Sequence, residues 1–160
     1  MGEQLNRFID IIARLRGPDG CPWDREQDHK SLLSCLLDEA YEFIEAVDLG
    51  DPEKMKEELG DLLLQVGLHA RMGKEDGVFD IEDIAREINE KLVRRHPHVF
   101  GNARVSSSTE VIGNWEKIKK SEKGKEHRTS YVDDIPINLP QLLRAEKIQR
   151  RVARVGFDWD

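Results

Sequence analysis

The chain has 160 residues, of which 38% are hydrophobic, 6% aromatic and 36% charged. This length fits one modest domain, or a compact unit that completes its core by oligomerising. The net charge of −7 argues against general binding to nucleic acids or anionic membranes. No hydrophobic run approaches membrane-spanning length, and the N-terminus does not resemble a signal peptide. Two cysteines without a CxxC motif suit a reducing compartment, so we expect a cytoplasmic protein.

Hydrophobic residues recur at helical spacing from the start of the chain. This spacing predicts a helix over 3–16 and a second over 31–49, which Gly50 ends. A third helix is predicted over 51–72, where an N-capping Asp is followed by a Pro at the first helical position. Because so few residues join the last two helices, we expect an antiparallel hairpin. Gly60, in the middle of the third helix, indicates close approach by a ligand or a neighbouring helix.

The remainder of the chain also reads as helical. A fourth helix is predicted over 81–95, and a fifth, charged helix is expected around Trp115 after a capping box. Residues 124–138 are rich in turn formers, and 139–155 form a last amphipathic segment. We see no strand pattern, so the sequence predicts an all-α bundle based on the helical hairpin.

Two carboxylate pairs, Glu39/Glu42 and Glu58/Asp61, lie on the two arms of the predicted hairpin. The members of each pair are three residues apart and therefore share one helix surface. Glu42 and Glu58 are equally far from Gly50 along the chain, so both pairs fall roughly 12 Å from the turn. Four acids can share a partly buried site only with a cation among them. Mg²⁺ or Mn²⁺ suits such oxygen ligands, which predicts a metal-dependent enzyme with a phosphorylated substrate.

Two alternatives compete with this metal site. The four acids could simply be solvated helix carboxylates, and their spacing alone does not decide between the two interpretations. A di-iron carboxylate bundle also gathers helical acids, but it needs a Glu-x-x-His motif from each of two helices. The chain offers only Glu26 to His29, at or before a helix start, so the di-iron alternative is disfavoured.

Four segments of the chain resemble the MazG-type nucleoside triphosphate pyrophosphohydrolases. They are LRGPDGCPWD at 15–24, DEAYE at 38–42, EELGD at 57–61 and RRHPHVF at 94–100. The segments follow the expected order, and the resemblance covers nearly the whole chain. The family pattern is Glu-Glu-x-x-Glu, a spacer and Glu-x-x-Asp. Here position 38 is Asp, where the family usually has Glu.

The resemblance implies an activity and a set of ligands. The expected reaction is Mg²⁺-dependent cleavage of a nucleoside triphosphate between the α- and β-phosphates, which yields the monophosphate and pyrophosphate. Mn²⁺ is an alternative ion. The resemblance also implies a homodimer or higher homo-oligomer, which agrees with the thin core that so few helices provide. The positions that resemble the family's magnesium ligands are Glu39, Glu42, Glu58 and Asp61.

Other residues are candidates for binding substrate and moving a proton. Lys91 and Arg95 match family positions that reach the phosphates, and Trp115 matches a position that contacts the base. Lys54, one turn before the second acidic pair, is a further candidate for phosphate binding, although a solvated lysine is an equally good interpretation.

The proton of the attacking water could pass to Glu39 or to its neighbour Asp38. The sequence does not choose between these two acids.

The end of the chain resembles the connector that leads, in longer relatives, into a second copy of the domain. The chain therefore resembles the N-terminal half of a two-copy member, with a catalytic helical domain over 1–123 and a loop plus connector helix over 124–160. In such relatives the two halves need not be equally active. The alternative function is thus a non-catalytic nucleotide-sensing or dimerisation module that forms the N-terminal half of a larger enzyme.

Overall fold

The structure is a computed structural model that describes residues 2–122, 130, 132–133, 135–153 and 155–157. All regular secondary structure within these ranges is helical, which confirms the all-α prediction. None of the described helices is both long and apolar enough to cross a membrane. The chain divides into two compact units, residues 1–91 and 92–160. The domain boundary predicted at 123/124 stays a prediction.

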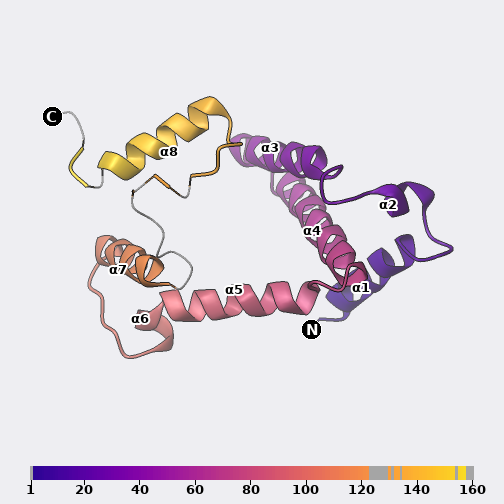
Figure 1. Ribbon diagram of the computed structural model, residues 1–160, viewed down its shortest axis with the longest axis horizontal. Coiled ribbons are helices and arrows are strands. Elements are labelled where there is room, and N and C mark those ends of the chain that lie inside the picture. The colour runs from indigo at the N-terminus through magenta and orange to yellow at the C-terminus, as the bar shows by residue number, and fades with distance from the viewer. Residues whose placement is uncertain (1, 123–129, 131, 134, 154, 158–160) are drawn as a thin grey trace. The chain divides into compact units, whose positions relative to one another are not determined.

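The first unit is built on the predicted helical hairpin. Its arms are α3 (Leu33–Leu49) and α4 (Pro52–Glu75), which pack side by side (Figure 1). Gly50 reverses the chain in a left-handed conformation, with φ of 66°, which glycine adopts without the penalty of a Cβ. Asp51 then caps α4, because its side chain accepts hydrogen bonds from the first turn. Local sequence signals therefore fix both sides of this turn.

Three further helices complete the first unit. They are α1 (Glu3–Leu15), α2 (Pro22–Glu26) and the larger part of α5 (Ile81–Arg95). The bounds of α1 and α5 agree closely with prediction, whereas α2 lies in a stretch for which no helix was predicted. Helix α3 begins two residues later than predicted, because Asp28 accepts hydrogen bonds from two backbone amides and forms a turn before it.

Helix α4 runs one turn further than predicted, to Glu75. Arg71 contacts Glu75 from the preceding turn, with 2.7 Å between Nε and Oε1. Arg16, at the end of α1, places its Nη2 2.9 Å from the other oxygen of Glu75. These ion pairs hold the last turn of α4 against α1.

The core of the first unit lies at the end of the hairpin away from its turn. There α1 packs on α4 (Figure 1), and a Cβ at Gly67 would lie 2.3 Å from Ile12 Cδ1 and 2.8 Å from Phe8 Cζ. The absence of that atom lets the two helices approach. The buried cluster consists of Ile12, Leu32, Leu68 and Met72, with Phe8 and Leu64 packed against it. Each such side chain contributes roughly 1.5–3 kcal/mol by leaving water.

The second unit contains the last turn of α5, α6 (Pro97–Phe100), α7 (Ser108–Ser121) and α8 (Gln141–Ala153). Ser107 caps α7 as predicted, whereas the Glu110 carboxylate bonds to the backbone and hydroxyl of Ser106. Most of the loop predicted over 124–138 lies outside the described residues. Within the predicted amphipathic segment at 139–155, α8 forms the helix.

Candidate metal centre

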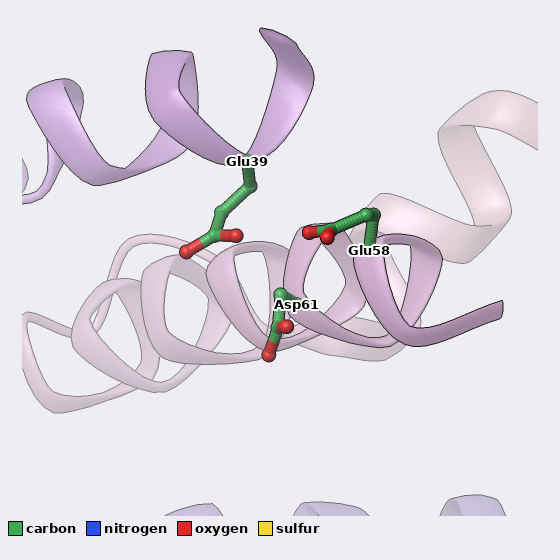
Figure 2. Close-up of side chains that lie close together, drawn as sticks. All are labelled: Glu39, Glu58 and Asp61. Carbon is green, nitrogen blue, oxygen red and sulfur yellow. The ribbon is translucent and has the colours of Figure 1, made fainter. Parts of the chain in front are cut away.

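Three of the four predicted metal ligands converge between the arms of the hairpin. Glu39 projects from α3, while Glu58 and Asp61 project from one face of α4 (Figure 2). One carboxylate oxygen from each of the three residues lies within 4.8 Å of the other two. Glu39 and Asp61 are equally distant along the chain from Gly50, so the antiparallel packing brings them level.

Glu42, the fourth predicted ligand, is exposed and lies outside this close group. Its charge still reaches the group, because it raises the pKa of both Glu39 and Glu58. Asp38, the alternative proton acceptor, is also exposed, and its charge likewise raises the pKa of Glu39. These two acids therefore add negative potential at the edge of the group.

The site does not favour the ionised form of its two glutamates. Glu58 is only 4% exposed, and burial raises its pKa, as does the charge of Glu42, whereas Lys54 acts in the opposite direction. Burial is also the main cause of a raised pKa at Glu39, followed by the charge of Asp61. A cation bound among these carboxylates would stabilise their ionised forms.

Lys54, predicted to bind substrate, has its main partner outside the close group. Its Nζ lies 2.5 Å from Oε2 of Glu45 on α3, and this hydrogen bond is the main reason that the pKa of Lys54 is raised. The charges of Glu58 and Glu42 contribute as well. Lys54 therefore bridges the two arms of the hairpin and only partly offsets the acids.

The three close acids fit a hard divalent ion. Opposite ligands of an octahedral Mg²⁺ lie roughly 4 Å apart, a separation close to the spread of the oxygens in this group. An all-carboxylate set suits Mg²⁺ or Mn²⁺, whereas Zn²⁺ sites generally use histidine or cysteine. Three protein oxygens leave positions open for water and phosphate oxygens.

The other predicted substrate-binding residues lie on α5 and α7. Lys91, in the first unit, places its Nζ 3.8 Å from Oε1 of Glu87. In the second unit, the Arg95 guanidinium lies 5.1 Å from the centre of the Trp115 ring. Its Nη2 also approaches Oε2 of Glu122 to 2.6 Å. The structure thus joins Arg95 and Trp115 in one cluster, with Glu122 as a partner.

Two residues of interest were missed by the sequence analysis. No local sequence pattern predicts that Glu122 contacts Arg95, because the two residues lie 27 positions apart. The position of Gln65 could have been noticed in the sequence, since it follows Asp61 by one helical turn and shares its face of α4. It is 5% exposed.

The fold and the site together define an all-α protein with a carboxylate-lined candidate site for a divalent cation. The model of the MazG nucleotide pyrophosphohydrolase domain matches residues 27–100 of the chain, a stretch that contains the whole hairpin. A crystal structure of a mazG-related protein from Thermotoga maritima has a TM-score of 0.61 and 33% sequence identity, and the match covers 72% of this chain and 98% of that one. The chain belongs to the MazG family.

Longer relatives share even more sequence with this chain. A nucleoside triphosphate pyrophosphohydrolase from Escherichia coli K12 is 47% identical over 98% of the chain. A nucleoside triphosphate pyrophosphohydrolase/pyrophosphatase MazG from Thermotoga maritima is 48% identical over 99% of the chain. In both cases the chain spans 60% of the relative's length.

Proposed function

We propose that the chain hydrolyses nucleoside triphosphates between the α- and β-phosphates, with Mg²⁺ as the cofactor and Mn²⁺ as an alternative. The products are a nucleoside monophosphate and pyrophosphate. The observation that carries this proposal is the convergence of Glu39, Glu58 and Asp61 within 4.8 Å. Among the described residues, no ion pair neutralises any of the three. The names of the E. coli and Thermotoga relatives support the substrate class.

The ligands are Glu39, Glu58 and Asp61, with Glu42 at the edge of the site. A bound ion would offset negative charge on the triphosphate and on the leaving pyrophosphate. We favour Glu39 over Asp38 as the group that takes the proton from water, because Glu39 faces the other ligands and Asp38 is exposed. A carboxylate has two oxygens, so one can hold the ion while the other accepts a proton.

The cations and the aromatic ring would bind the rest of the substrate. Lys91 and Arg95 are assigned to the phosphates, as their match to family positions implies, and Lys54 is a further candidate. The guanidinium of Arg95 lies over the Trp115 ring, 5.1 Å from its centre, which supports a role for this ring in contacts through its face. A nucleobase can stack in the same manner, so Trp115 is assigned to the base.

We further propose that the active form is a homodimer. The hairpin exposes a set of large hydrophobic side chains from both arms, with exposed fractions of 39–56%: Leu33, Leu37, Tyr41, Ile44, Leu59 and Leu63. Apolar faces of this kind mark interaction surfaces. Gly60 lies on the same arm as two of these residues, and an added Cβ there would meet nothing within 4 Å. The close approach expected at Gly60 is thus not made by the described residues of this chain, which leaves a ligand or a helix of a second copy to make it.

The dimer is tested by placing a charge on its face. Leu37→Lys should shift the protein from dimer to monomer in analytical ultracentrifugation, because a lysine buried between copies is unpaired. The control is Leu142→Lys on α8, where the side chain is 88% exposed. A wild-type protein that sediments as a monomer at all concentrations would contradict the dimer.

The alternative function is a non-catalytic nucleotide-sensing or dimerisation module. It rests on the resemblance to two-copy relatives, in which the two halves need not be equally active. The two proposals differ in turnover. A module would bind Mg²⁺ and nucleotide without steady release of pyrophosphate.

Pyrophosphate release should therefore be measured over a panel of standard and modified nucleoside triphosphates, with and without Mg²⁺. The wild type should turn over only with the ion, and Asp61→Asn should abolish release. Asp48→Asn is the matched control, since Asp48 is an exposed acid near the end of α3. Equal activity of wild type and Asp61→Asn would overturn the proposed site. Binding without turnover in the wild type would favour the module.

A further inference from the structure

Gln65 lies where the buried face of α4 changes from acidic to hydrophobic. This face carries Glu58 and Asp61 near the hairpin turn and Leu68 and Met72 in the core, at spacings of three and four residues that keep them on one side of a helix. On this face of α4, Gln65 lies between the acidic pair and the hydrophobic pair. A hydrophobic side chain would extend the core there, so the amide calls for a separate explanation.

The side-chain carbonyl oxygen of Gln65 is buried, and no described residue donates a hydrogen bond to it. The residue is 5% exposed, and its Oε1 has no hydrogen-bond partner among the described residues. Such an acceptor is costly unless a donor reaches it. Asp61, one turn earlier, can only accept when ionised. The Nδ1 of His69, one turn later, is paired with Nδ1 of His29 at 2.7 Å.

The geometry of the hairpin directs the amide toward the acids. Side chains of an α-helix point toward its N-terminus. The side chain of Gln65 therefore points toward Asp61, which lies one helical turn earlier on α4. Glu39 lies on the antiparallel arm, level with Asp61, and by the same rule leans toward the level of Gln65. By this rule we expect the unpartnered oxygen on the core side of the group formed by Glu39, Glu58 and Asp61.

We propose that Gln65 is a positioning residue for this site, whose Oε1 accepts a hydrogen bond from a water in the first shell of the bound ion. This inference rests on the proposed function. Mg²⁺ keeps several of its waters when it binds to proteins, and those waters are donors that the acids themselves cannot supply. Outer groups that orient metal ligands change metal affinity by about 10–100-fold. Gln65 would fix one water on the core side of the site.

The test is the affinity for Mn²⁺, measured without nucleotide from the electron paramagnetic resonance signal of the free ion. Gln65→Met keeps the length of the side chain and removes the amide. It should raise the Kd for Mn²⁺ by about tenfold, while the thermal midpoint of the metal-free protein stays equal or rises because an unpaired acceptor is lost. Gln65→Glu keeps an oxygen acceptor and should bind Mn²⁺ at least as tightly as wild type. Gln4→Met, at an exposed position of α1, is the matched control and should change neither quantity.

The outcomes separate this inference from the proposed function. An unchanged Kd in Gln65→Met, with a raised Kd in Asp61→Asn, would overturn the role of Gln65 and leave the metal site standing. A lower thermal midpoint for metal-free Gln65→Met than for Gln4→Met would show that the amide serves packing, and would also overturn it. A wild type that binds no Mn²⁺ would contradict both proposals.

Discussion

The two units of the chain each contain a cluster of charged side chains, and the clusters are built in opposite ways. In the first unit, Glu39, Glu58 and Asp61 carry charges of one sign, and burial raises the pKa of the two glutamates. In the second unit, Arg95 and Glu122 carry opposite charges, each side chain is 11% exposed, and the hydrogen bond to Glu122 raises the pKa of Arg95.

This contrast shows what distinguishes a candidate ligand site from an internal ion pair. The Arg95–Glu122 pair supplies its own counter-charge, and its atoms are in direct contact at 2.6 Å. Among the described residues, Lys54 alone is seen to offset the acids of the hairpin, and it is bonded to Glu45. Like charges gathered in a partly buried site must either take up protons or bind a cation.

The largest expected effect comes from removing one buried acid. Glu58→Gln should lower Mg²⁺-dependent pyrophosphate release by on the order of 100-fold or more. It should also raise the thermal midpoint of the metal-free protein, because the raised pKa of Glu58 means that its charge opposes folding at neutral pH. Activity and thermal unfolding without Mg²⁺ should be measured together.

The control for this variant is Glu57→Gln, which removes the same charge from an exposed neighbour. It should leave the thermal midpoint nearly unchanged. If Glu58→Gln is less stable than wild type in the absence of metal, the carboxylate is stabilised by the chain itself and the contrast between the two clusters fails.

A second prediction concerns pH. The pKa of Glu39 and Glu58 is raised above the usual value of 4.5, so the folded protein holds their protons more tightly than the unfolded chain does. In their protonated form these two acids contribute to folding stability. That contribution is fully present below pH 4.5 and is lost as the pH rises through their pKa values in the folded protein. The midpoint difference between metal-free Glu58→Gln and wild type should therefore grow from pH 5 to pH 8.

Mg²⁺ provides a second test of this pH dependence, because the ion binds the ionised form of the acids. The stabilisation that saturating Mg²⁺ gives to the wild type should increase over the same pH range. Thermal unfolding in a pH series, with and without Mg²⁺, measures both trends. A stabilisation by Mg²⁺ that does not depend on pH would place the bound ion away from these carboxylates.

The smallest effect is expected in the second unit. Glu122→Gln removes the charged partner of the largely buried Arg95 side chain and should cost about 1–3 kcal/mol of stability. Glu146→Gln, which breaks the exposed pair with Arg150 on α8, should cost well under about 1 kcal/mol. Chemical denaturation of both variants makes the comparison. Equal costs would show that Arg95 and Glu122 do not form a tightly held pair.

The sequence was sufficient for the helices and the hairpin, because hydrophobic spacing and the signals at Gly50 and Asp51 act locally. It also predicted that the two acidic pairs lie level on the hairpin, and three of these four acids converge in the structure. It did not distinguish Glu42 from Glu39. Residues three apart lie about 60° apart around a helix, and only packing decides which one faces the other arm.

The remaining omissions depend on tertiary contacts. Glu122 contacts Arg95 from 27 residues away, and no local sequence pattern predicts that contact. The place of Gln65 on the face of Asp61 can be read from the sequence, but its burial depends on how the helices pack.

The central claim is that Glu39, Glu58 and Asp61 hold a divalent cation. A crystal structure of the protein soaked in Mn²⁺ tests it directly through the anomalous scattering of the ion. We predict an anomalous peak between α3 and α4, within coordination distance of all three carboxylates. Crystals that bind Mn²⁺ elsewhere while these three side chains remain without an ion would contradict the claim.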